Sequence, residues 1–155
     1  MAKTSAGLLM YRTRGGVLEA LLVHPGGPFW SRKDLGAWSI PKGEVSPGED
    51  LLAAAHREFE EETGAVVEGP TISLGELRQA GGKVVHAWAV RGDFDPTQLR
   101  SNTFSLEWPR GSGVTREFPE VDRAAWFPIA EGRRKILPSQ MPFVDRLLDA
   151  LRTTS

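Results

Sequence analysis

Apolar residues near the start of the chain form two strand-like runs separated by a pair of glycines. Leu8 to Tyr11 make the first run and Val17 to Val23 the second, with Gly15 and Gly16 between them. Adjacent glycines readily adopt the positive φ angles that tight hairpin turns require, so the pattern predicts a β-hairpin over residues 5–24. The segment that follows, residues 24–37, is rich in proline and glycine and is expected to be a loop.

Further strand patterns occur in the second half of the chain. Residues 71–77 alternate between apolar and polar, which is typical of a strand with one buried face. Residues 84–90 are almost continuously apolar, which indicates a strand buried on both faces. A shorter strand is expected around residues 104–108, whereas the polar segments 92–101 and 109–118 are expected to be loops.

A helix is predicted in the middle of the chain, after a turn-rich loop. Leu52, Ala55 and Phe59 recur at helical spacing and would form its apolar stripe. Asp50 is the preferred N-cap residue; the alternative is Ser46, with Pro47 at the first helical position and Glu49 closing a capping box. We favour Asp50 because Gly48 would weaken an earlier first turn. Gly64 stands where a left-handed C-cap residue is expected.

Two more helices are predicted towards the end of the chain. Residues 129–136 form a short helix that Pro138 stops. A closing amphipathic helix is indicated by apolar residues at helical spacing, namely Phe143, Val144, Leu147, Leu148 and Leu151. Strands before, between and after helices are typical of a mixed α/β or α+β layered domain.

Bulk composition narrows the classes of function. The 155 residues carry a net charge of -1 and no cysteine. We therefore expect one domain over residues 1–155, without a disulfide framework, a thiolate metal site or a general basic field for nucleic acid or membranes. The apolar run from Ala6 to Tyr11 is too short for a signal or membrane segment, so a cytoplasmic protein is the default expectation.

The predicted central helix carries a cluster of acidic side chains. Glu58, Glu61 and Glu62 stand at i, i+3 and i+4 and so share one face, from which Glu60 points away. A solvated acidic face is the simplest interpretation, because exposed like charges at this spacing cost only about 0.2–0.5 kcal/mol per pair. If the carboxylates instead converge in a cleft they require a cation, and oxygen ligands suit Mg²⁺ or Mn²⁺.

The acidic helix and the loop before it resemble the Nudix box. Seven identities carry the resemblance, namely Gly43, Glu49, Arg57, Glu58, Glu61, Glu62 and Gly64. Two aliphatic positions of the box hold Phe59 and Ala65, which remain apolar. The box spans residues 43–65, and the strand pattern around it is compatible with the family along nearly the whole chain. The resemblance implies a Nudix fold, in which a mixed β-sheet is sandwiched between helices, and residues 124–128 resemble the late strand of such domains.

The resemblance also implies a site and a reaction class. Glu58, Glu61 and Glu62 would bind the metal and activate water, with the backbone carbonyl of Lys42 as an extra ligand. Arg57 would hold Glu49 or another carboxylate of the box in place by a bidentate pair. Glu120, six residues before Trp126, is the candidate for a further metal ligand from a late loop. The implied activity is Mg²⁺- or Mn²⁺-dependent hydrolysis of a nucleoside diphosphate linked to another group.

Aromatic residues and a lysine suggest the substrate. The lead into the box, Trp38-Ser39-Ile40-Pro41-Lys42-Gly43, is similar to that of diadenosine polyphosphate hydrolases and diphosphoinositol polyphosphate hydrolases. Lys42 adds a point charge suited to several phosphates. Phe29 and Trp30, and Trp38 beside the box, are candidates for contact with the substrate, although Phe29 and Trp30 would equally serve as a plug for one end of the core.

The expected partner is therefore a small nucleotide, most consistently a dinucleoside polyphosphate or a nucleoside triphosphate. ADP-ribose and diphosphoinositol polyphosphate are alternatives, and so is a binding module that senses a nucleotide without cleaving it. Such a module is expected to have lost carboxylates of the box, and all three are present here. We expect no stable nucleic acid or membrane partner, and the oligomeric state is left open.

Overall fold

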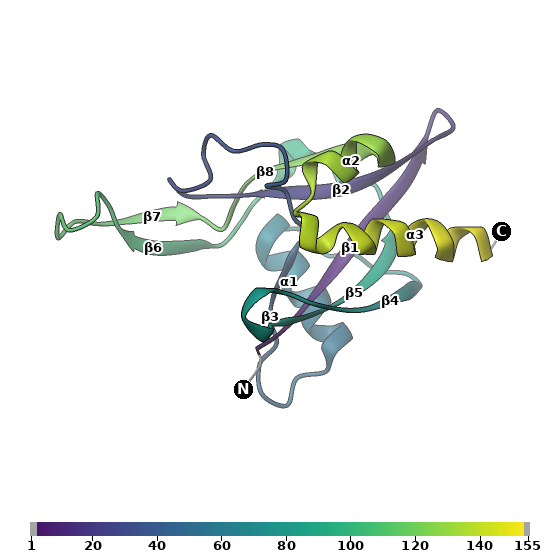
Figure 1. Ribbon diagram of the computed structural model, residues 1–155, viewed down its shortest axis with the longest axis horizontal. Helices are drawn as coiled ribbons and strands as arrows, with labels where there is room; N and C mark the ends of the chain where they lie inside the picture. The colour runs from purple at the N-terminus through teal and green to yellow at the C-terminus, as the bar shows by residue number, and fades with distance from the viewer. Residues whose placement is uncertain (1–2, 154–155) are drawn as a thin grey trace.

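The computed structural model describes residues 3–153, arranged as a mixed sheet with helices on both faces (Figure 1). The main sheet contains β1 (Thr4–Arg14), β2 (Val17–Pro25), β3 (Lys42–Glu44), β4 (Thr71–Arg78), β5 (Val84–Arg91) and β8 (Val121–Pro128). Its strand order is β4-β5-β1-β2-β8, and β3 pairs with β1. The β1–β5 pair is parallel and the other pairs are antiparallel.

The helices cover opposite faces of this sheet because alternate residues of β1 point to opposite sides. Leu8 and Met10 pack with α1 (Leu51–Thr63), whereas Leu9 and Tyr11 belong to the cluster that includes α3 (Met141–Thr153). The short α2 (Ile129–Lys135) follows β8. The layered fold implied by the resemblance is thus confirmed. Among the described residues 3–153, no helix is long and apolar enough to cross a membrane.

Helix α1 begins and ends where the sequence predicts. The side chain of Asp50 accepts a hydrogen bond from the N–H of Ala53 at 3.0 Å, which makes it the N-cap. Gly64 has φ of 83° and donates its N–H to the carbonyl of Glu60, as a left-handed C-cap does. Ala54, Ala55 and Phe59 are buried, and Glu58 and Glu62 follow them by one turn on the same side of the helix, where they reach the edge of the sheet.

Two of the segments predicted as loops contain strands. Residues 115–119 form β7 (Thr115–Pro119), which pairs with β6 (Thr103–Glu107) in a separate two-stranded sheet that projects from the body (Figure 1). Only Phe118 of β7 is partly buried, so the apolar pattern that would reveal a strand is missing. The three-residue β3 was also missed, because it is too short to show a period and is fixed by pairing with β1.

Candidate active site

Five carboxylates from three parts of the chain line one hollow of about 320 Å³. Glu58, Glu61 and Glu62 come from α1, Glu44 comes from the end of β3, and Glu120 comes from the turn between β7 and β8. The hollow is also lined by Lys42, Gly43 and Asn102. The structure therefore brings together the three glutamates of the predicted helix cluster and Glu120, which lies outside the box, whereas Glu49 does not line the hollow.

Gly43 allows the carboxylate of Glu58 to approach the backbone of β3. A Cβ atom built at Gly43 would lie 1.9 Å from Oε2 of Glu58 and 2.1 Å from its Cδ. Any side chain at this position would occupy the space that the carboxylate fills, since real Cβ contacts are not found below 3.0 Å. A glycine is therefore needed at position 43 because of the close contact with Glu58 of the helix, and not because of a strained turn.

Arg57 joins the loop and the helix of the box through all five of its N–H donors. Nε and Nη2 donate to the two carboxylate oxygens of Glu49 at 2.7 and 2.9 Å, in the bidentate pair that the resemblance implied. Nη1 donates to Glu58 at 2.8 Å and to Glu61 at 3.0 Å, and Nη2 also donates to the carbonyl of Glu44. The hydrogen bonds from Arg57 lower the pKa of Glu49 to about 2, so Glu49 remains ionised over the working range of most enzymes.

We therefore expect Arg57→Lys to lower both activity and thermal stability. An ammonium has three donors and no planar fork, so it cannot hold Glu49 bidentately while also reaching Glu58 and Glu61. Activity should fall by about tenfold or more, the scale of losing one charge-assisted hydrogen bond of about 1.5–3 kcal/mol. Steady-state kinetics and a melting curve measure the two effects. Arg152→Lys, on the last turn of α3, is the control; equal behaviour of the two variants would show that Arg57 does not organise the site.

Glu62 carries the largest displacement of a carboxyl pKa in this hollow. Burial raises the pKa of Glu62 to about 8, against the hydrogen bond that its Oε1 accepts from the N–H of Lys42 at 3.2 Å. Repulsion from Glu58 and Glu120 acts in the same direction as burial. Burial, followed by repulsion from Glu61, also raises the pKa of Glu58. Neighbouring carboxylates with raised pKa values form a site that favours a positive charge.

A pH dependence of stability follows from Glu62. The folded pKa lies above the ordinary value of 4.5, so the stabilisation by the protonated form is complete below that value and is lost as the pH rises towards about 8. In chelator, Glu62→Gln should lack this loss, and its melting temperature should exceed that of the wild type increasingly over this range. Each 1 kcal/mol corresponds to about 2–4 °C in a domain of this size. If the melting temperatures of the two proteins changed with pH in parallel, the prediction would be contradicted. Added Mg²⁺ should reduce the difference between their melting temperatures.

The donor chemistry of the hollow fits a hard divalent cation. Carboxylates and a backbone carbonyl supply only oxygen ligands, which is the set that Mg²⁺ and Mn²⁺ prefer. Within residues 3–153, no three acidic or histidine side chains already stand in coordinating positions around one point. Glu58 and Glu61 instead share Nη1 of Arg57. These two carboxylates would hold a cation after small side-chain rotations, because their Cα atoms are already placed on one face of α1.

The aromatic candidates are placed differently from one another. Trp30 lines a pocket of about 260 Å³ that shares Lys42, Glu62 and Glu120 with the carboxylate hollow. Phe29 lines neither of them; the residue is 50% exposed, and its ring meets that of Trp108 edge-on at 5.4 Å. The other residues that line the Trp30 pocket were not predicted from the sequence to contact the substrate, namely Val23, Pro25, Ser39, Val121 and Leu137.

The structure places Trp38 in the core and not among the residues that line the carboxylate hollow or the Trp30 pocket. Trp38 is 4% exposed, its ring packs edge-on against both His24 and Phe127, and its indole N–H donates to Asp34 at 2.8 Å. Its backbone N–H donates to the carbonyl of Lys135, at the end of α2. Trp38 is therefore a core residue. Its burial could not be predicted from the local sequence, because the end of α2, which is distant in the sequence, packs beside it.

Asn102 is a residue of the hollow that sequence reasoning missed. Its backbone N–H donates to the carbonyl of Glu61 at 2.8 Å, and its carbonyl accepts from the N–H of Glu120 at 2.7 Å. The backbone of Asn102 therefore connects Glu61, near the end of α1, to Glu120. No local pattern marks an asparagine in a polar loop, so only the tertiary structure reveals this contact.

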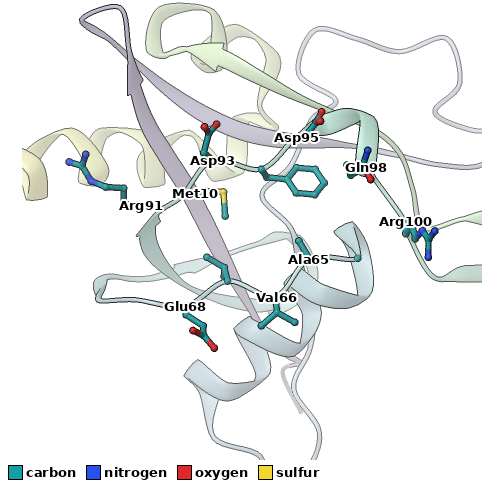
Figure 2. A pocket seen from close by; sticks show the side chains of 13 residues that line it. Met10, Ala65, Val66, Glu68, Arg91, Asp93, Asp95, Gln98 and Arg100 are labelled. Atoms are coloured by element: carbon teal, nitrogen blue, oxygen red, sulfur yellow. The ribbon is translucent and has the colours of Figure 1, made fainter.

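A larger hollow, of about 570 Å³, lies beyond the carboxyl end of α1 (Figure 2). Met10 and Ala65 face its interior, whereas Arg91 and Arg100 lie at its two ends. Two of its acidic residues already have structural partners, because Asp93 pairs with Arg12 and Asp95 caps the short turn at Pro96–Gln98. None of the box glutamates lines it, so the smaller carboxylate hollow is the better candidate for chemistry.

The chain is similar to a known family and to individual known proteins. A family model described as NUDIX domain matches residues 1–147. The chain is 40% identical over 72 residues to the asymmetrical bis(5'-nucleosyl)-tetraphosphatase of Caenorhabditis elegans. The matched segment covers 46% of this chain and 48% of that protein. It is 41% identical over 59 residues to the RNA pyrophosphohydrolase of Erythrobacter litoralis (strain HTCC2594), 38% of this chain and 32% of that one. Less than half the length of each relative is therefore matched.

A solved structure shares the whole fold. The NUDIX domain of Shewanella oneidensis NrtR, in complex with ADP ribose, superposes with a TM-score of 0.67 at 16% identity, covering 97% of this chain and 89% of that one. At this identity the similarity concerns the fold alone.

Proposed function

The chain belongs to the NUDIX family, and we propose that it is a divalent-metal-dependent pyrophosphohydrolase that cleaves a nucleoside diphosphate linked to another group. The observation that carries this proposal is the convergence of Glu58, Glu61, Glu62 and Glu120 beside Lys42 around one hollow. Such a concentration of carboxylates is electrostatically costly unless a cation is bound. Phosphate anhydrides are the substrates that both a bound cation and a neighbouring lysine would stabilise.

The residues of the hollow would divide the work. Glu58, Glu61 and Glu62 would hold Mg²⁺ or Mn²⁺, with Glu120 and the backbone carbonyl of Lys42 as further oxygen donors. A bound divalent cation supplies neutralisation of phosphate charge and a lowered pKa of bound water. Arg57 keeps the carboxylates of Glu58 and Glu61 together through one nitrogen, and Glu49 fixes the guanidinium. The Lys42 ammonium, close enough to lower the pKa of Glu62, would contact the phosphate chain.

We infer that the base of the nucleotide occupies the Trp30 pocket. This pocket shares three residues with the carboxylate hollow, so a ligand that fills both has an aromatic group next to a phosphate. A dinucleoside polyphosphate such as diadenosine tetraphosphate is the favoured class, supported by Lys42 and by the similarity to the C. elegans tetraphosphatase. A nucleoside triphosphate is the close rival, ahead of ADP-ribose and diphosphoinositol polyphosphate.

A substrate panel tests this function. The protein is incubated with diadenosine tetraphosphate, the nucleoside triphosphates, ADP-ribose, a diphosphoinositol polyphosphate and a short RNA with a 5'-triphosphate. Each is tested with Mg²⁺, with Mn²⁺ and with chelator, and products are identified by mass. We expect the highest kcat/KM for diadenosine tetraphosphate and no turnover in chelator. Binding of a nucleotide without any turnover would favour a sensing module, and a preference for ADP-ribose would overturn the substrate class alone.

Two adjacent aromatics provide a matched pair for the binding site. Trp30→Ala should raise KM for diadenosine tetraphosphate by about tenfold or more, because stacking on a base contributes about 1–3 kcal/mol. Phe29→Ala is the control, since its ring lies outside the pocket although it neighbours Trp30 in the same loop. Steady-state kinetics on both variants measure the difference. A larger effect of Phe29→Ala than of Trp30→Ala would place the base elsewhere.

A further inference from the structure

Gln140 is a polar residue that is completely buried and lies outside the carboxylate hollow. It stands at the end of the short turn Pro138–Gln140, just before α3, and its exposed fraction is 0%. Its Oε1 accepts from the backbone N–H of Ile40 at 3.1 Å, and its Nε2 donates to Oγ of Ser39 at 3.1 Å. A backbone N–H can only donate, so the contact with Ile40 fixes the orientation of the amide.

The hydroxyl of Ser39 completes this hydrogen-bond network. Its Oγ donates to the carbonyl of Ile40 at 2.7 Å while it accepts from Gln140, so its single proton is already used. The two side chains together satisfy the N–H and the carbonyl of Ile40, as a neighbouring strand would. Ile40 is 0% exposed, and a polar group left unpaired at this depth would be costly.

The backbone of Gln140 connects the same network to Leu137. The N–H of Gln140 donates to the carbonyl of Leu137 at 2.8 Å, and the N–H of Leu137 donates to the carbonyl of Trp38 at 2.7 Å. Ser39 in turn exchanges two backbone hydrogen bonds with Val23, at 2.8 and 2.9 Å. Three segments that are distant in the sequence are thus connected around one buried glutamine.

The connected residues form one wall of the Trp30 pocket. Val23, Ser39 and Leu137 all line this pocket, and Gln140 does not. A ligand in the pocket would therefore contact the three wall residues and not the glutamine behind them. Any influence of Gln140 on such a ligand must act through Ser39 and Leu137, which it holds by hydrogen bonds.

We propose that Gln140 is a positioning residue that preorganises this wall of the Trp30 pocket for the base of the nucleotide. Its side chain holds Ser39 and its backbone holds Leu137, so the two residues keep their spacing before a ligand arrives. A wall that is already ordered does not have to be ordered on binding, and this raises affinity. The use of the wall by a nucleotide rests on the proposed function, whereas the hydrogen-bond network does not.

Amide hydrogen exchange tests the network without any substrate. In the wild type, we expect the N–H of Ile40 and the side-chain amide protons of Gln140 to exchange slowly, as buried hydrogen-bonded protons do. Gln140→Met keeps the length of the side chain but removes both of its hydrogen bonds, so the N–H of Ile40 should exchange at least about tenfold faster. Equal exchange rates of this N–H in the two proteins would overturn the network.

Ser39→Ala keeps the test decisive if Gln140→Met does not fold. It leaves the glutamine in place and removes only the acceptor of Nε2 and the donor to the carbonyl of Ile40. The side-chain amide protons of Gln140 should then exchange at least about tenfold faster than in the wild type. Unchanged exchange of these protons would overturn the network.

Kinetics test the positioning role. Gln140→Met should raise KM for diadenosine tetraphosphate by about tenfold with kcat within about twofold, because the pairing of β3 with β1 holds Lys42 and Gly43 independently. Gln79→Met is the matched control and should keep the KM of the wild type. It removes two hydrogen bonds to Ser139, in the same turn, without touching the wall. A loss of kcat with unchanged KM, or equal effects of the two variants, would overturn the positioning role.

A binding measurement separates this inference from the proposed function. The dissociation constants of AMP with Mg²⁺, and of Mn²⁺ alone, are measured by calorimetry on the folded wild type and both glutamine variants. We expect Gln140→Met to weaken AMP binding by about tenfold and Mn²⁺ binding by less than about twofold. If the wild type cleaves no nucleotide, the proposed function fails, while the AMP affinities still decide the role of the wall. If nucleotides are cleaved but the wild type binds no AMP, or Gln140→Met binds it equally well, the positioning role is wrong and the function stands.

Discussion

Glu61→Gln is expected to lower kcat by at least about 100-fold while the protein remains folded. Loss of one preorganised electrostatic group at a reacting centre costs activity on this scale. The substitution keeps the shape of the side chain but removes a ligand charge from a hollow that Glu58, Glu62 and Glu120 also line. Stability should not fall, because a carboxylate is removed from among like charges and Nη1 of Arg57 keeps its partner Glu58.

Glu60→Gln is the matched control for this prediction. Glu60 stands next to Glu61 in the same helix, but it is exposed and does not line the hollow. We expect wild-type kcat for Glu60→Gln, and in calorimetry weaker Mg²⁺ or Mn²⁺ binding only for Glu61→Gln. Full turnover by Glu61→Gln, or by the wild type in excess chelator, would show that the carboxylate cluster is not the catalytic centre.

The parts of the site that lie on α1 were predictable because a helix converts sequence spacing into a common face. Glu58, Glu61 and Glu62 needed only the positions of the helix ends, which Asp50 and Gly64 mark clearly. The hairpin of β1 and β2 was predictable for a similar reason, since two glycines separate two apolar runs. In both cases the information is local, and the tertiary structure does not override it.

The parts that sequence reasoning missed depend on contacts between distant segments. Asn102 lies in the hollow only because its backbone bridges Glu61 and Glu120. Trp38 was assigned to the substrate because it precedes the box, yet the end of α2 returns beside it and buries its ring. Phe29 and Trp30 are neighbours in a loop without a period, so their sequence cannot indicate which ring faces the pocket. β7 has mostly exposed side chains and thus no apolar pattern.

The loop between β2 and β3, which carries Trp30, packs against the turn between β7 and β8, which carries Glu120. Gly26 donates its N–H to the carbonyl of Glu120 at 3.0 Å, and a Cβ at Gly26 would lie 1.9 Å from the carbonyl oxygen of Pro119. The loop that carries Trp30 and the turn that carries Glu120 are therefore in backbone contact. This contact places the Trp30 pocket beside the carboxylate hollow, which is the arrangement that the proposed nucleotide substrate would require.

Gly43→Ala is the second substitution with a large expected effect, and it should separate activity from stability. The new methyl group would displace the Glu58 carboxylate, which ends a flexible side chain, so the fold should survive. The backbone of Gly43 cannot move away instead, because β3 pairs with β1 at Ala6. A displacement of a catalytic group by about 1 Å can cost about 100-fold in rate, and we expect kcat to fall by at least this factor.

A double-mutant cycle identifies the cause of that loss. Glu58→Ala alone should lower kcat strongly, and Gly43→Ala should then add no further loss, because the methyl group enters space that the carboxylate has left. Gly132→Ala in α2 is the control, since a Cβ there meets only the Cβ of Phe127 at an ordinary 3.7 Å. We expect that variant to keep wild-type kcat. Additive losses for Gly43→Ala and Glu58→Ala would mean that the glycine acts on something other than Glu58, such as the Lys42 carbonyl beside it.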